Sequence, residues 1–103
     1  MTMAADRCIR AWEAAYRQYG HASEIWSRSP EDDPAAAWGM ASASWAVAEA
    51  WREIAAVSRL PWWTLAAVES AAEAFEAQAR DWEAREQGED YAEDDEAWEG
   101  AES

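Results

Sequence analysis

The chain has 103 residues, of which 22 are Asp or Glu and only 8 are basic, giving a formal net charge of −14. So negative a surface repels nucleic acids and anionic membranes, which argues against direct binding to either and favours a basic partner. Nine residues are Trp, the residue type most enriched at the hot spots of protein interfaces. The composition therefore predicts a protein that binds another protein.

The length suits one domain with a single core. Cys8 is the one cysteine of the sequence, so an intramolecular disulfide is excluded and a reducing cytoplasm is expected. The longest stretch without a charge, 34–48, is shorter than the roughly 20 residues that cross a bilayer. The N-terminal residues lack the apolar run of a secretory signal. Ala and Arg without any Lys suggest a GC-rich bacterial or phage genome.

A first helix is predicted over 4–27. Its apolar positions step by four and three residues, which is the spacing of one helical face. Gly20 weakens this pattern, so a kink near that residue is expected as an alternative to a straight helix. The stripe consists of Ala5, Ile9, Trp12, Tyr16, Tyr19, Ser23 and Trp26.

A second helix is predicted over 34–58. Asp33 followed by Pro34 is an N-cap residue followed by proline at the first helical position. Two adjacent apolar stripes run along this helix, one through Met40 and Trp51, the other through Trp38 and Trp45. A helix that is apolar over so much of its circumference is expected to be central and covered on two sides, by this chain or by a partner.

A third helix is predicted over 61–86, opened by Pro61 and ended by Gly88. Its apolar stripe keeps the four-three spacing from Leu65 to Trp82. The opposite side is acidic, with carboxylates about one turn apart: Glu69, Glu73, Glu76 and, further along, Glu83.

The segment 88–103 differs in composition from the rest of the chain. Nine acidic residues and no basic residue lie between positions 86 and 103, and so charged a segment is expected to be disordered on its own. Tyr91 and Trp98 are seven residues apart and would share a face if the segment became helical on a partner. We predict an all-α fold: a small three-helix bundle over 1–87 and a disordered acidic tail over 88–103. An extended antiparallel hairpin that dimerises is the alternative.

The sequence offers no constellation for catalysis, and we expect a non-enzymatic protein without cofactor or metal. His21 is the one histidine, which excludes two-His metal sites. Cys8 and His21 are about 20 Å apart along one predicted helix, so they cannot act as a nucleophile and its base. The acids at 31–33 match no calcium loop and are better explained by helix capping.

Candidate partner-binding residues come from the tryptophans outside the core, from the acidic side of the third helix and from the tail. Four tryptophans are assigned to the core instead: Trp12, Trp51 and Trp82 lie on core stripes, and Trp26 is expected to cap the core. The remaining Trp residues are harder to bury in a small bundle, and they pack on neighbouring helices or act as exposed anchors. With the acidic side of the third helix and the tail, the candidate residues are Trp38, Trp45, Trp62, Trp63, Glu69, Glu73, Glu76, Glu83, Tyr91, Asp94, Asp95 and Trp98.

Two functions follow from these residues. Regularly spaced carboxylates can imitate the phosphate array that a nucleic-acid-binding protein recognises, so a regulator or inhibitor acting on a basic surface is expected first. The alternative is a Trp-anchored adaptor or assembly subunit that forms a homo- or hetero-oligomer, including a homodimer. Strong sensitivity of the complex to salt favours the first function, and an oligomer that persists at high salt favours the second.

A third alternative rests on a resemblance. Tyr-Ala-Glu-Asp-Asp at 91–95 resembles the C-terminal Tyr-x-x-x-Asp/Glu export signal of small proteins of the WXG100 family, which are of similar length. Ala-Trp-Gly at 37–39 partly resembles the Trp-x-Gly turn of that family, while a full Trp-x-Gly occurs at 98–100, in the tail. The resemblance implies a secreted helical hairpin, although Pro61 would interrupt the second helix of such a hairpin.

Overall fold

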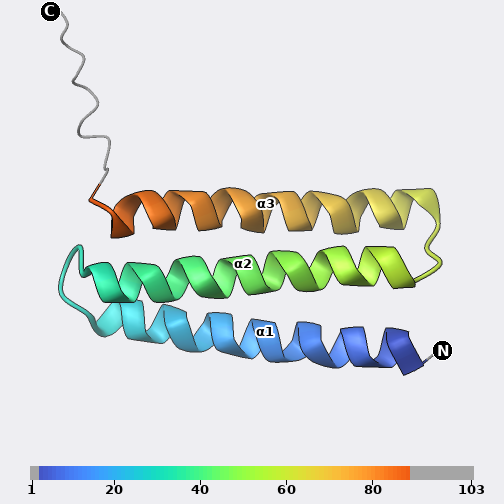
Figure 1. The fold of residues 1–103 in the computed structure, drawn as a ribbon, viewed down its shortest axis with the longest axis horizontal. Coiled ribbons are helices and arrows are strands. Elements are labelled where there is room, and N and C mark those ends of the chain that lie inside the picture. The colour runs from blue at the N-terminus through green and yellow to red at the C-terminus, as the bar shows by residue number, and fades with distance from the viewer. Residues whose placement is uncertain (1–2, 89–103) are drawn as a thin grey trace, which may run out of the picture.

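In the computed structural model, which describes residues 3–88, three helices lie side by side in one layer with α2 between α1 and α3 (Figure 1). They are α1 (Met3–Arg28), α2 (Pro34–Val57) and α3 (Trp62–Glu86), and neighbours run antiparallel. The predicted all-α, three-helix fold is confirmed for this part of the chain. No helix within residues 3–88 has both the length and the apolarity needed to cross a membrane. The expected acidic tail falls almost wholly on residues 89–103, outside the described residues.

Local sequence signals set the helix ends. Asp33 is the N-cap of α2: its carboxylate accepts a hydrogen bond from the backbone N–H of Ala35 at 3.3 Å, and Pro34 occupies the first turn. Helix α3 begins directly after Pro61, and Gly88 follows its end with φ of +75°, a conformation that suits glycine. Helix α1 continues through Gly20 without a break.

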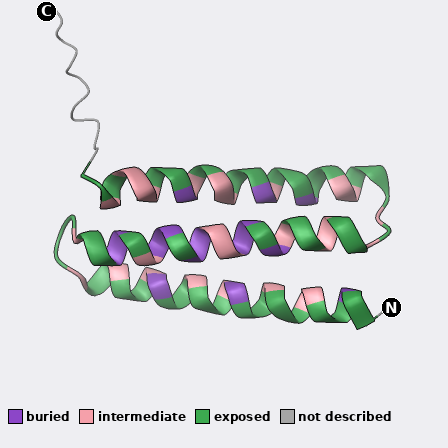
Figure 2. Ribbon diagram, in the orientation of Figure 1, coloured by how far each residue is buried: buried purple, intermediate pink, exposed green. Residues whose placement is uncertain are grey.

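Small residues bring α2 close to both neighbours. Among the residues that the structure describes, most of the buried ones belong to α2 (Figure 2), as expected for a helix covered on two sides. On α3, Ala72 and Ala79 have no exposed surface, and on α2 the same holds for Val47 and Ala48. Because an alanine side chain is a single methyl group, the helix backbones approach closely where these residues meet.

Helices α1 and α3 contact each other through aromatic side chains. None of their Cα atoms in the described chain come within 8 Å of one another. Phe75 on α3 instead packs edge-on against Tyr16 and Tyr19 on α1, with ring centroids 5.7 and 5.4 Å apart. Near the C-terminal ends of α1 and α3, Trp26 and Trp82 pack edge-on at 4.7 Å. Such pairs stabilise a fold beyond the area that they bury.

The remaining predicted core tryptophans pack as expected, although not all of their polar atoms are satisfied. The rings of Trp12 and Trp51 lie 5.2 Å apart in an edge-on arrangement next to the buried residues Val47 and Ala50. The indole N–H groups of both have no hydrogen-bond partner in the described chain, and neither does the buried hydroxyl of Ser44. Each such group costs about 1–3 kcal/mol of stability, which the aromatic packing must offset.

Candidate protein-binding surfaces

Two neighbouring tryptophans project from the start of α3. Trp62 is 80% exposed and Trp63 is 63% exposed. Both follow Pro61, the N-cap residue, which makes no side-chain capping hydrogen bond. Successive helical residues point about 100° apart, so the two indoles cannot both turn towards α2. The structure leaves both in solvent, where burying them against a partner would remove a large apolar surface from water.

Carboxylates continue the line of Trp62 along α3. Glu69 and Glu73 lie seven and eleven residues after Trp62, which places the three side chains on one face of the helix. Both carboxylates are exposed, and Glu76 follows on the same face at half burial. We call Trp62 and the three carboxylates Glu69, Glu73 and Glu76 together the α3 acidic face. The helices differ in charge as well: α1 carries four Arg and three acidic residues, whereas α3 carries two Arg and six acidic residues.

Arg52 of α2 lies against the α3 acidic face. Its Nε and Nη2 atoms donate to Glu76 Oε2 and Oε1, each at 3.0 Å, in a bidentate pair. The hydrogen bond to Glu76 raises the pKa of Arg52, and the charges of Glu76, Glu73 and Glu69 raise it further. The same hydrogen bond lowers the pKa of Glu76. Of the predicted carboxylates, Glu76 is therefore already paired within the chain, whereas Glu69 and Glu73 are open to a partner.

This pair predicts a pH-dependent contribution to stability. Because the pKa of folded Glu76 lies below its ordinary value of 4.5, its contribution is present above that value and is lost as the pH falls through the lower folded pKa. We expect Glu76→Gln to lower the urea midpoint at pH 7, and the gap to wild type to close as the pH drops below about 4.5. Urea titrations from pH 3 to pH 7 check this. A gap that stays constant over this range would contradict the prediction.

Trp45 and Trp38 differ in their surroundings. The indole N–H of Trp45 donates to Glu83 Oε2 at 2.7 Å, and the guanidinium of Arg80 lies 5.8 Å from the centre of its ring. Trp45 and Glu83, both predicted for partner binding, thus engage each other between α2 and α3. Trp38, one heptad earlier on α2, is 59% exposed. The two side chains that the sequence placed on one line therefore separate into a packed and an exposed residue.

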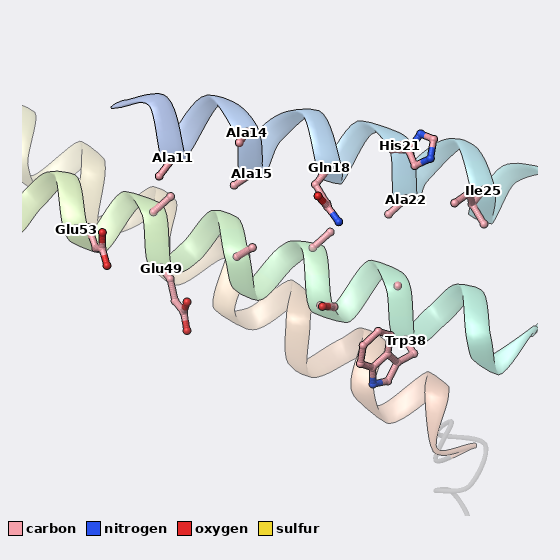
Figure 3. A pocket seen from close by; sticks show the side chains of 15 residues that line it. Ala11, Ala14, Ala15, Gln18, His21, Ala22, Ile25, Trp38, Glu49 and Glu53 are labelled. Carbon is pink, nitrogen blue, oxygen red and sulfur yellow. The ribbon is translucent and has the colours of Figure 1, made fainter. Parts of the chain in front are cut away.

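A groove runs between α1 and α2 next to Trp38 (Figure 3). Its volume is about 490 Å³. Most of the lining consists of small side chains, with Ile25 and Trp38 as its bulky members, and sequence reasoning did not single out this surface. The sequence does contain a signal for this groove, because a line of alanines runs along α1 next to its aromatic stripe. The small residues of the lining are Ala11, Ala14, Ala15, Ala22, Gly39, Ser42, Ala43, Ala46 and Ala50.

The groups with chemical reactivity stay apart from one another. The thiol of Cys8 donates to Glu53 Oε1 at 3.8 Å, and His21 is exposed at the edge of the groove. Within residues 3–88, no three His, Cys, Asp or Glu side chains come together in a way that could hold a metal ion. Tyr91, Asp94, Asp95 and Trp98 of the predicted binding set lie outside the described residues.

Comparison with known proteins adds no relative: no protein family, no curated protein sequence and no solved structure matches the chain. The resemblance to the WXG100 family implied a two-helix hairpin, whereas residues 3–88 form three helices with Pro61 between the second and the third. The 91–95 and 98–100 patterns of that resemblance lie beyond the described residues.

Proposed function

We propose that this chain is a non-enzymatic protein-binding module that recognises a basic surface of another protein through α3, as a regulator or inhibitor. The observation that carries the proposal is the face of α3 itself. Exposed Trp62 lies in line with the exposed carboxylates Glu69 and Glu73, and Trp63 lies beside it. Such a face fits a partner that has an apolar pocket flanked by Lys or Arg.

Physical chemistry assigns different roles to the two parts of this face. Desolvated aromatic anchors supply most of the affinity of an interface. Exposed carboxylates mainly speed the encounter with a positive partner and select against negative ones. The acidic residues between positions 89 and 103 add to the same charge, since they follow α3 in the sequence. A nucleic-acid-binding protein is the class of partner whose basic surface matches this charge.

Affinity capture with matched variants tests this function. The immobilised chain is incubated with a nuclease-treated bacterial lysate, and bound proteins are eluted in steps from about 50 mM to about 500 mM salt and identified. We expect basic proteins that elute as the salt rises. Trp62→Ala/Trp63→Ala and Glu69→Gln/Glu73→Gln should each weaken binding of the purified partner at least about tenfold.

The control variant removes the same number of negative charges, but from α1 instead of α3. Glu13 and Glu24 are exposed carboxylates on α1, so Glu13→Gln/Glu24→Gln alters the net charge as much as the α3 variant does. This control should retain wild-type affinity. Equal losses in both double variants would mean that net charge alone drives binding, and the role of the α3 acidic face would be refuted.

An assembly subunit is the second candidate function. The observation in its favour is exposed Trp38 at the edge of the groove between α1 and α2, on a surface that the α3 acidic face does not include. Complexes formed through this groove would be governed by apolar contact and would persist at high salt.

A further inference from the structure

The groove between α1 and α2 has two unlike ends (Figure 3). One end carries two bulky exposed side chains, Trp38 at 59% and Ile25 at 48% exposure. The other end is lined by methyl groups, from Ala11 and Ala14 on α1 and from α2 residues such as Ala50. One end therefore presents two bulky apolar side chains, whereas the apolar side chains at the other end are all small. The two ends are complementary in size.

The polar groups of the groove are separated in the same way. Glu49 and Glu53 lie at the alanine end, whereas His21 and the indole of Trp38 lie at the bulky end (Figure 3). The carboxylates are hydrogen-bond acceptors, and an indole N–H is a donor. This chain already uses such a pair between α2 and α3, where the indole N–H of Trp45 donates to Glu83 at 2.7 Å.

We propose that two copies of this chain associate through this groove as an antiparallel two-fold dimer. In a two-fold interface, a residue i that contacts residue j of the partner copy is matched by j contacting i. The antiparallel arrangement places Trp38 and Ile25 of each copy over the alanine end of the other, and brings the indole N–H towards the partner's carboxylates. In a parallel arrangement, the bulky ends of the two copies would coincide, and so would the ends that carry Glu49 and Glu53. Steric crowding and charge repulsion would then disfavour the dimer.

The spacing of the lining residues places the two-fold axis. Gln18 is seven residues from Ile25 and seven from Ala11, so it lies midway along the α1 side of the groove. On α2, Ala46 lies eight residues after Trp38 and seven before Glu53. The axis therefore passes close to Gln18 and Ala46. Helices α1 and α2 of both copies then form a four-helix arrangement around a core of small residues and two indoles.

Charge argues against the acidic C-terminal segment as the occupant of the groove. Residues 89–103 contain eight acidic residues and no basic residue, and the alanine end of the groove already presents Glu49 and Glu53. Like charges repel each other. The segment also follows α3, which lies on the far side of α2 from α1 (Figure 1). A second copy, with a donor at one end and acceptors at the other, matches the groove better.

Disulfide trapping at the predicted axis tests the arrangement. Gln18→Cys in a Cys8→Ser background puts one thiol on each copy next to the axis, and Gln18 is exposed, so the fold should tolerate the change. We expect mild oxidation to form an intermolecular disulfide at least about tenfold faster than in the matched control Ala74→Cys, an exposed site on α3. Equal rates at the two sites would overturn the proposal.

Sedimentation of the full chain provides the second measurement. We expect a dimer that persists at high salt, and Trp38→Gln should raise its dissociation constant at least about tenfold. The control Trp63→Gln, an exposed indole outside the groove, should leave dimerisation unchanged. A monomer at all concentrations, or a dimer indifferent to Trp38→Gln, would overturn the proposal. The proposal would also be overturned if the Gln18→Cys thiol became reactive only after residues 89–103 were removed. That result would show that this segment occupies the groove.

The two proposals concern different helices, so they can fail separately. Loss of dimerisation in Trp38→Gln with normal capture of a basic partner would support the groove as the dimer interface and leave α3 as the partner site. Loss of capture in the α3 variants with a normal dimer would show that the groove acts independently of the α3 acidic face.

Discussion

Phe75→Ala should destabilise the fold by about 3 kcal/mol, because this ring carries the contact between α1 and α3 at the centre of the layer. It packs edge-on against both Tyr16 and Tyr19, and the described parts of α1 and α3 have no close backbone contact that could take over. A small domain is typically stable by only about 5–15 kcal/mol in total. Urea unfolding followed by circular dichroism measures the loss.

The control for this prediction keeps an apolar side chain at the same place. Phe75→Leu fills most of the volume and should cost less than about 1.5 kcal/mol. Equal destabilisation by Phe75→Ala and Phe75→Leu would contradict this expectation, because it would assign the effect to the aromatic contacts with Tyr16 and Tyr19 and not to side-chain volume. A loss below about 1 kcal/mol in Phe75→Ala would mean that other contacts between α1 and α3 suffice, namely the hydrogen bond from Tyr19 to Gln78 and the packing of Trp26 against Trp82.

The second large effect is expected from Ala79→Leu. Ala79 has no exposed surface and lies on the side of α3 that packs against α2. Three additional carbon atoms have no space there, so the helices must move apart or adopt strained side-chain conformations, at a cost of about 1–3 kcal/mol. The midpoint of thermal unfolding should fall by roughly 4–8 °C for each kcal/mol lost.

A neighbouring alanine supplies the matched control. Ala77 lies two residues before Ala79 and is exposed, so Ala77→Leu makes the same chemical change on the solvent side of α3. Its effect on stability should stay within about 0.5 kcal/mol. Similar destabilisation by both variants would attribute the loss to leucine in this helix rather than to crowding between α2 and α3.

The shortage of conventional bulky core side chains explains why both effects are large. The buried core consists mostly of alanines with Val47, Val68 and Met40 among them, so close helix approach depends on residues that must stay small. The bulkier apolar surface is supplied by half-buried aromatic rings on all three helices. Such a core tolerates neither added volume between the helices nor the loss of a ring that bridges them.

The binding surfaces show where sequence reasoning was incomplete. Regular spacing placed Glu69, Glu73 and Glu76 on one side of α3, and the structure agrees. Spacing within one helix could not show that Arg52 of α2 lies against these carboxylates, because that contact depends on how α2 and α3 pack. For the same reason, the sequence could not separate Trp45, which bonds to Glu83, from exposed Trp38.

The sequence by itself determined the helices, because their signals are local. Asp33 and Pro34 start α2, Pro61 precedes α3 and Gly88 follows it, and these signals act through hydrogen bonds and backbone angles of adjacent residues. Tertiary structure alone decided which aromatic rings meet, which carboxylates are paired and where a groove remains open. Those outcomes depend on the alignment of one helix against another, which is set by many weak contacts between residues distant in sequence.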